Sequence, residues 1–240
     1  MLGLGSSIID TSTRLWHPTD VSSLEMWLVA RQEYLTLDGT AIDAWTAKYG
    51  KAAAYNYTQS TDAQRPTWDA ANQKVVTDGS NDNLQEGSNT ITLDTSATGW
   101  TIAVYCTSSD WDGANQVFLG DNAGNNDFFR HDNAAQTLSI KNDGQTRTVT
   151  LDTPSALVND QFYHIMATVQ TNGDFVVYID NVAQTDTESF TNTKDLEIDQ
   201  IIGKYGASQT LDGAIKSIMI FREPLGAEDR KGCYEHMTQR

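Results

Sequence analysis

The 240-residue sequence has few of the residues that build covalent or metal-based frameworks. It contains two cysteines, Cys106 and Cys233, and four histidines that are scattered along the chain. Neither residue type occurs in the spacing of a zinc site or a redox motif, so we expect no such chemistry. Cys106 lies in an apolar run and is interpreted as a buried hydrophobic residue, and His164 as a structural strand residue. The sequence leaves open whether the two cysteines pair.

Basic residues and long apolar runs are also scarce. The chain has 16 lysines and arginines against 32 aspartates and glutamates, a formal net charge of −16. Such a surface repels phosphate backbones and anionic lipids, so we expect neither nucleic acid nor membrane insertion. No apolar run reaches the roughly 18 residues of a membrane span. The opening, MLGLGSSIIDTSTRLW, lacks the basic and apolar regions of a signal peptide, and we expect synthesis in a host cytoplasm without one.

What the sequence has in abundance is short alternating runs separated by turn residues. Two of them, at 163–169 and 175–179, flank Asn172-Gly173, a dipeptide that readily takes the positive φ angles of a tight hairpin. Asp143-Gly144 indicates a second hairpin. The chain has four prolines and almost no helical periodicity, apart from a predicted short C-terminal helix at 227–237. The pattern predicts an all-β fold, a two-sheet antiparallel sandwich.

The first strand is predicted over residues 24–30. Alternation places Leu24, Met26 and Leu28 on one face and Trp27 and Val29 on the other. Trp27, like Trp100 in a later strand, is predicted to be core.

No internal repeat and no linker rich in proline, glycine or serine divides the chain, so we predict one domain over residues 21–240. Residues 1–20 are small, polar and weakly patterned, and are predicted to form an N-terminal arm. The apolar pair Ile8-Ile9 is its candidate docking element, which would become ordered against a neighbouring subunit.

Several segments follow one another in a characteristic order. From the N-terminus they are WLVA, AW, RPTW and DGSNDNL, and in the C-terminal half FYHI, an Asn-Gly hairpin, YIDN, IIG and LDGAIKSIMIF. Over roughly residues 20–237 this order resembles laminin-G-like domains of the concanavalin A-like lectin/glucanase superfamily, of the kind found in tailed-phage structural proteins. The opening MLGLGSS is similar to the start of such phage proteins. The resemblance implies a jelly-roll sandwich that ends in a helix.

One segment resembles an enzymatic motif. Concanavalin-type β-glucanases carry Glu-x-Asp-x-x-Glu on a strand, and retaining hydrolysis needs two carboxyl groups about 5 Å apart. Here Glu197 and Asp199 fit the first two positions, whereas Ile202 stands at the third. The missing second acid predicts that this strand is not catalytic.

Calcium is the candidate cofactor that the sequence offers, although it establishes none. Laminin-G-like domains often bind one calcium at a sandwich rim, and hard cations take clustered oxygen ligands. Two loops rich in aspartate and asparagine supply such oxygens, with Asp78 and Asp82 in the first and Asp121 and Asp127 in the second. The competing interpretation is that both loops are ordinary turns.

A glycan site is predicted at aromatic residues. Trp111 is surrounded by turn residues, so we expect it to be exposed, and Tyr55 and Tyr57 alternate onto one face, where they could line a groove. The alternative is that these aromatic residues pack in the core.

Three functional hypotheses follow. The first is a non-enzymatic virion surface protein of a tailed phage, a head decoration or a tail or appendage component that docks on capsid or tail subunits. The second is a carbohydrate-binding lectin for host adhesion, with or without calcium, and with a host surface glycan as partner. The third, a glycoside hydrolase, is disfavoured by Ile202.

Overall fold

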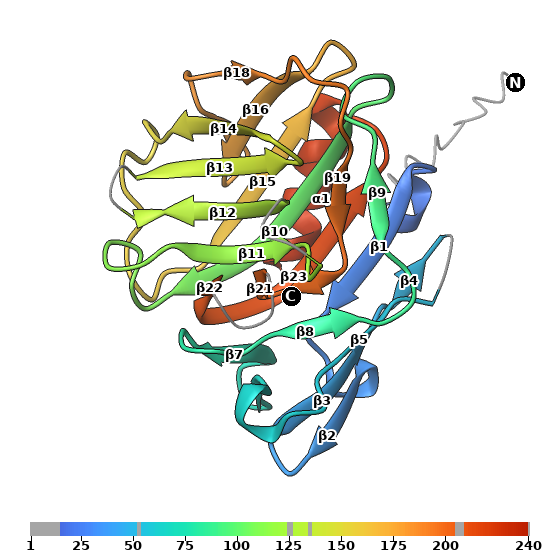
Figure 1. Ribbon diagram of the computed structural model, residues 1–240, viewed down its shortest axis with the longest axis vertical. Coiled ribbons are helices and arrows are strands. Elements are labelled where there is room, and N and C mark those ends of the chain that lie inside the picture. The colour runs from blue at the N-terminus through green and yellow to red at the C-terminus, as the bar shows by residue number, and fades with distance from the viewer. Residues whose placement is uncertain (1–14, 52–53, 124–126, 134–135, 205–208, 240) are drawn as a thin grey trace, which may run out of the picture.

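The computed structural model describes residues 15–51, 54–123, 127–133, 136–204 and 209–239. In this part of the chain, antiparallel strands form two packed layers, and one helix, α1 (Ala227–Thr238), lies behind them (Figure 1). The predicted antiparallel jelly-roll sandwich with a short C-terminal helix is therefore confirmed.

The back layer contains the longest strands. In spatial order it comprises β4 (Tyr49–Gly50), β1 (Leu24–Val29), β23 (Asp212–Phe221), β10 (Trp100–Ser108), β15 (Tyr163–Val169) and β16 (Asp174–Ile179). The short strands β17 (Val182–Ala183) and β18 (Glu188–Ser189) pair with β16.

The front layer crosses the viewer's side of Figure 1. Its spatial order is β14 (Gln145–Thr150), β13 (Thr137–Asn142), β12 (Phe128–Asp132), β11 (Gln116–Gly120), β20 (Gln200–Ile201), β8 (Leu84–Glu86), β5 (Asn56–Thr58), β3 (Ala41–Thr46) and β2 (Leu35–Asp38). β6 (Thr67–Asp69) pairs with β3, and β7 (Lys74–Asp78) pairs with both β6 and β23, which joins the two layers.

The remaining elements are short. β9 (Ile91–Leu93) pairs with β19 (Leu196–Ile198), and β21 (Gly203–Lys204) pairs with β22 (Gln209–Thr210). Single 3-10 turns occur at η1 (Pro18–Asp20), η2 (Gln32–Tyr34) and η3 (Asp62–Gln64). No helix in the described part of the chain combines the length and the apolar character that a bilayer crossing requires.

Two apolar cores hold these layers together. The larger lies between the sheets and contains Trp100 and Cys106, while the smaller lies between the back layer and α1 and contains Trp27 and Cys233. Trp27 and Trp100 are buried, as predicted. Both cysteines are buried and free, and because they lie in different cores they do not form a disulfide.

The first strand departs from the predicted alternation. Met26 and Leu28 face the core between the sheets, but Leu24 joins Trp27 and Val29 in the smaller core. The reason is an irregularity between Leu24 and Met26 in the pairing of β1 with β23. It changes the side of the sheet on which the alternating side chains lie. The prediction that Leu24 shares a face with Met26 was therefore wrong.

The predicted N-terminal arm lies mostly outside the described residues, and so do Ile8 and Ile9. Its last residues are described and contact the body of the protein. Trp16 donates a hydrogen bond from Nε1 to Asp229 of α1 at 2.9 Å. A Cβ added at Gly232 would lie 2.3 Å from the Trp16 ring, so the glycine permits this close approach. Leu15 is 89% exposed.

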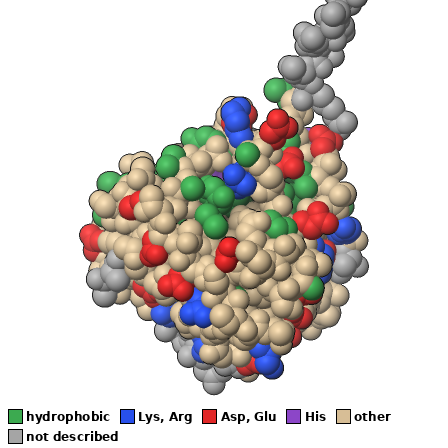
Figure 2. Space-filling model, turned by 90° about the horizontal axis from the view of Figure 1, so that it is seen from above, with side chains coloured by type: hydrophobic (Ala, Val, Ile, Leu, Met, Phe, Trp, Pro, Cys, Tyr) green, Lys and Arg blue, Asp and Glu red, His purple; other side chains and the backbone are tan. Residues whose placement is uncertain are grey.

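The surface reflects the acidic composition without a single concentrated patch in the view of Figure 2. That view is onto the end of the sandwich that is uppermost in Figure 1, and acidic side chains are scattered over it together with basic and hydrophobic ones. This arrangement is typical of a well-solvated surface.

The hairpin between β15 and β16 provides a test of the fold. Gly173 has a φ of +86°, and a Cβ there would lie 2.5 Å from the carbonyl oxygen of Phe190. We expect Gly173→Ala to lower the free energy of unfolding by about 2–3 kcal/mol, because it combines an unfavourable φ with a clash against backbone. Urea denaturation measures this change.

Gly39→Ala is the matched control. Gly39 has a φ of +64°, but a Cβ added there would have nothing within 4 Å, so that change should cost about 1 kcal/mol or less. Equal losses in the two variants would contradict the position of Phe190 over the hairpin.

A polar groove and an acidic cleft on the front layer

A groove with a volume of about 530 Å³ lies on the front layer, where β3, β5 and β8 meet the loop after β11. We call it the polar groove. Its lining includes Asp43, Thr58, Arg65, Gln85, Asn122 and Asp199. These side chains come from segments far apart in the sequence and are brought together by the pairing of β3, β5, β8 and β20.

Strand alternation determines which side chains reach the groove. On β5, Tyr57 is buried in the core between the sheets and its neighbour Thr58 is exposed. On β8, Leu84 is buried in the same core and Gln85 points the other way. Thr58 and Gln85 are direct ladder partners, so they stand side by side on the outer face.

A network of side-chain amides fixes the floor of the groove. The buried Asn83 accepts hydrogen bonds at Oδ1 from the amide of Gln59 at 3.0 Å and from that of Gln85 at 3.1 Å. Its own amide donates to the carbonyl oxygen of Asn81 at 2.9 Å. Because both the oxygen and the nitrogen of the buried Asn83 amide have hydrogen-bond partners, Gln59 and Gln85 are held in place without a ligand.

The groove carries negative charge. Arg65 lines it, but its NH1 group lies 2.9 Å from Asp43, 2.8 Å from Asp62 and 3.5 Å from Asp38, so three carboxylates surround this one guanidinium. Glu86 and Asp199 add two further acids to the lining. Ligands that bring their own negative charge are therefore disfavoured.

Asp199 lies where the groove adjoins a second hollow. It accepts a hydrogen bond from the backbone N–H of Asn122 at 2.7 Å. Burial raises its pKa, and the neighbouring charges of Asp121 and Glu197 add to the rise, whereas the hydrogen bond from Asn122 opposes it. The carboxyl group lies at the edge of the groove, where it can accept a hydrogen bond from a hydroxyl group.

The second hollow, of about 270 Å³, is lined mainly by carboxylates and is called the acidic cleft. Its acidic residues are Asp121, Asp127, Asp143, Asp195 and Glu197. Asp127 is 2% exposed and accepts backbone hydrogen bonds from Asp143 and Glu197, both at 2.6 Å. Burial is the largest cause of a rise in its pKa to about 6.

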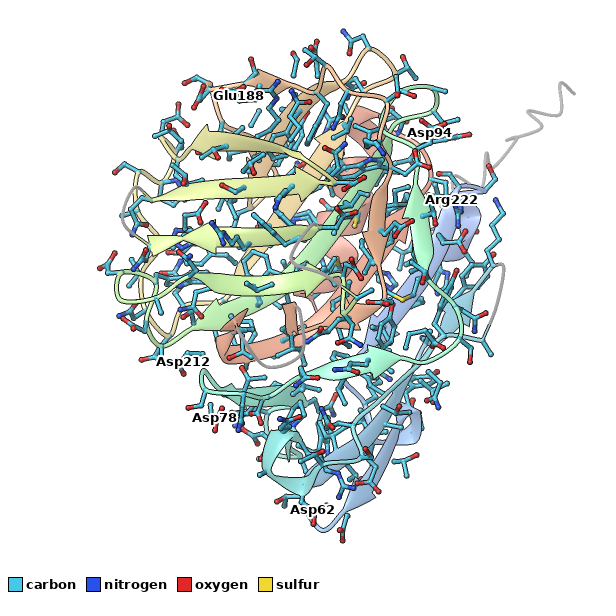
Figure 3. The ribbon with its side chains drawn as sticks, viewed as in Figure 1. Asp62, Asp78, Asp94, Glu188, Asp212 and Arg222 are labelled. Carbon is cyan, nitrogen blue, oxygen red and sulfur yellow. The ribbon has the colours of Figure 1, made fainter. Side chains whose placement is uncertain are left out.

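The structure separates the four predicted calcium ligands. Asp121 and Asp127 share the acidic cleft. Asp78 ends β7, where it is the ladder partner of Asp212 in β23, and Asp82 lies in the loop that follows (Figure 3). Asp78 and Asp82 accept hydrogen bonds from backbone N–H groups of their own loop, which is the behaviour of turn residues. In the part of the chain that the structure describes, no three acidic, histidine or cysteine side chains converge closely enough to hold a metal ion.

The prediction that Trp111, Tyr55 and Tyr57 reach the surface and form a glycan site was wrong, because all three are buried. Trp111 is 0% exposed and packs on His131, with ring centroids 5.0 Å apart. Tyr55 and Tyr57 are also buried, and the Tyr55 hydroxyl donates to Glu25. For the two tyrosines, the physical reason is that residues 55 and 57 alternate toward the core, so Asn56 and Thr58 are the residues on the outer face. Trp111 lies in a turn and is covered by the rings of Phe118, His131 and Tyr163.

The sequence reasoning missed the residues that line the groove, among them Thr58, Gln85 and Asn122. The signal was present, since the polar positions that alternate with Tyr57 and Leu84 had to face outward. What the sequence lacked was the pairing that brings three separate segments together.

The enzymatic motif lies between the cleft and the groove. Glu197 is exposed and Asp199 is half-buried, so they share the outer side, as the alternation requires. Ile202, at the position of the second acid, is fully buried in the core between the sheets and has a φ of +69°. A carboxyl group at this position would point into the core and away from any sugar.

This architecture, two antiparallel layers with a polar groove on the outer face, is that of a lectin-like jelly roll. A profile of the family described as the concanavalin A-like lectin/glucanases superfamily matches residues 78–229, more than half of the chain. The protein belongs to that family. A search of curated proteins found no match.

Solved structures share the fold at low sequence identity. The Trypanosoma rangeli sialidase is 10% identical with a TM-score of 0.59, and the match covers 91% of this chain and 33% of the sialidase. The binding domain of botulinum neurotoxin serotype D is 13% identical with a TM-score of 0.60, over 89% of this chain and 51% of that one. The protein thus spans about a third of the sialidase and half of the neurotoxin domain.

A third neighbour is a separate domain of similar size. Domain 4 of AbnA, an extracellular arabinanase from Geobacillus stearothermophilus, was solved in complex with arabinotriose. It is 12% identical with a TM-score of 0.54, and the match covers 87% of this chain and 97% of that domain. At these identities the likeness shows the fold.

The burial of Asp82 generates a test of the calcium prediction. Burial raises its pKa from 3.8 to about 6. A carboxyl group whose pKa is higher in the folded state destabilises the fold once the pH passes the unfolded value, and increasingly up to the folded value. We therefore expect Asp82→Asn to raise the free energy of unfolding by about 1–2 kcal/mol at pH 8, with the gain vanishing at about pH 4.

Asp94→Asn is the control variant, for which we expect the opposite change in the free energy of unfolding. Backbone N–H groups of Ala97 and Ser96 donate to Asp94 and lower its pKa, so its charge stabilises the fold at neutral pH and the variant should be less stable there. Chemical denaturation at several pH values measures both. A loss of stability for Asp82→Asn at pH 8 in millimolar calcium would contradict the turn interpretation and identify Asp82 as a calcium ligand.

Proposed function

We propose that the protein is a non-enzymatic glycan-binding domain and that the polar groove holds an uncharged sugar. The observation that carries the proposal is the convergence of Thr58, Gln85, Asn122 and Asp199 on one outer face, above a satisfied amide network. Carboxylates accept hydrogen bonds from sugar hydroxyls, and side-chain amides both donate and accept. A groove of about 530 Å³ has the size of a short oligosaccharide site.

Charge selects the class of glycan. A sialylated or otherwise acidic sugar would place its carboxylate among Asp43, Glu86 and Asp199, while Arg65 is already surrounded by acids. An uncharged sugar avoids this repulsion and uses the same carboxylates as acceptors. The proposed ligand is therefore a neutral oligosaccharide, although the sialidase shares the fold.

The strength of sugar binding depends on whether aromatic side chains are available for the sugar to stack on. All the described residues that line the groove are polar or glycine, so binding rests on hydrogen bonds that exchange with water. We expect weak binding at a single site, strengthened when many copies are displayed together. Calcium stays a prediction for the acidic cleft, which Asp121 and Asp127 line beside the groove.

The groove is tested by calorimetric titration with neutral and sialylated oligosaccharides, arabinotriose among the neutral ones. We expect saturable binding of a neutral sugar, none of a sialylated one, and no released sugar product. Gln85→Ala and Thr58→Ala should each weaken binding by about 3- to 10-fold, because each removes one hydrogen-bonding group.

Thr146→Ala is the matched control. Thr146 is exposed on β14 of the same layer but does not line the groove, so its loss should leave binding unchanged. Binding of sialylated sugars, or equal weakening by Thr146→Ala, would contradict the proposed site.

We also propose that this domain is displayed on the virion of a tailed phage, as a head decoration or a tail or appendage component. The support is the order of segments shared with phage laminin-G-like proteins and the opening MLGLGSS. The apolar pair Ile8-Ile9 precedes Trp16, which contacts the body, and would dock on a capsid or tail subunit. Display in many copies would compensate for weak glycan binding.

Immunogold labelling of purified particles tests the location. We expect labelling on head or tail, and its loss when residues 2–14 are deleted. The deletion keeps Trp16 and its contact with α1, so thermal stability should not change. Labelling that persists without residues 2–14 would contradict the docking role, and particles that never label would contradict the virion assignment.

A further inference from the structure

A cluster of soft metal-binding atoms lies between the back layer and α1, away from the polar groove. Its centre is Cys233, on the inner side of α1. The Cys233 sulfur lies 3.6 Å from Sδ of Met237, 3.8 Å from Sδ of Met219 and 3.9 Å from Nε2 of His164. Four potential ligands thus meet from α1, β23 and β15.

These separations match the three edges of a coordination tetrahedron that would meet at the Cys233 sulfur. With metal–sulfur bonds of about 2.3 Å, two ligands of one tetrahedral metal stand about 3.8 Å apart. The three separations differ from that value by only a few tenths of an ångström. A metal ion could therefore enter the cluster with small shifts of flexible methionine side chains.

Apart from an edge-on ring contact with Tyr234, with centroids 5.5 Å apart, the imidazole lies next to the thiol. His164 is 0% exposed, and among the described residues its Nδ1 has no hydrogen-bond partner, while its Nε2 faces the Cys233 sulfur. An imidazole nitrogen that faces a thiol sulfur is placed to bind a metal ion together with it.

Ligand softness and charge point to one ion. Thioether sulfurs select Cu(I) and are poor ligands for zinc, calcium and magnesium. A Cu(I) ion and one thiolate sum to zero charge, whereas a divalent ion would leave a net positive charge in an apolar core at a large desolvation cost. We propose that Cys233, His164, Met219 and Met237 form a Cu(I) site.

Binding is a simple exchange of a proton for the metal. The Cys233 S–H bond breaks, a Cu–S bond forms, and the proton leaves to solvent, with no change of oxidation state. Burial raises the pKa of the Cys233 thiol, so the metal must displace this proton. The site is reached when α1, the last element of the described chain, opens locally from the sheet.

The test uses the reduced full-length chain under anaerobic conditions. Cu(I), supplied as its acetonitrile complex, is titrated in competition with the chelator bicinchoninate. We expect one Cu(I) per chain, and X-ray absorption should show one nitrogen and three sulfur ligands. Met219→Leu and Met237→Leu keep the side-chain volume, so each should retain the fold and weaken Cu(I) binding by about 10-fold or more.

The two cysteines provide the matched pair. Cys233→Ser should abolish binding, while Cys106→Ser, in the core between the sheets, should leave it unchanged. Cu(I) binding that survives Cys233→Ser or both methionine changes would overturn the proposal. A wild-type chain that retains no Cu(I) against the chelator would overturn it as well.

Discussion

The polar groove depends on the burial of Tyr57 and Leu84 in the core between the sheets. These two side chains fix the facing of β5 and β8, and a slip of one residue would exchange the polar and apolar faces. Because the strands are ladder partners, Thr58 and Gln85 are placed together on the outer surface. The buried Asn83 then fixes the amide groups around them, so core packing and the geometry of the groove are set by the same few residues.

Electrostatics is the basis for the class of ligand proposed for this surface. The chain carries a net charge of −16, and eight of its acidic residues line the polar groove and the acidic cleft. Arg65, which could have attracted an anionic sugar, is instead held by Asp38, Asp43 and Asp62. The fold is shared with a sialidase and a neurotoxin domain, but the proposal of a neutral ligand rests on the side chains of this groove and not on the shared fold.

The sequence predicted the sandwich because its signals were local. Asn172-Gly173 determines a hairpin through backbone φ alone, and Gly173 has the positive φ that this requires. The site was not predictable in the same way. Trp111 lies among turn residues, but the fold covers it, and Asn122 approaches β8 through strand pairing over a long sequence distance. Leu24 changed face through an irregularity that alternation does not reveal.

The most direct test of the account is to map by NMR where a neutral oligosaccharide binds. A titration of the ¹⁵N-labelled chain with a neutral trisaccharide should shift the backbone amides around Thr58, Gln85 and Asn122, together with the side-chain amide of Gln85. The amides of α1, on the opposite side of the back layer, should not move. Shifts centred on α1, or no shifts at saturating sugar, would contradict the assignment of the groove as the glycan site.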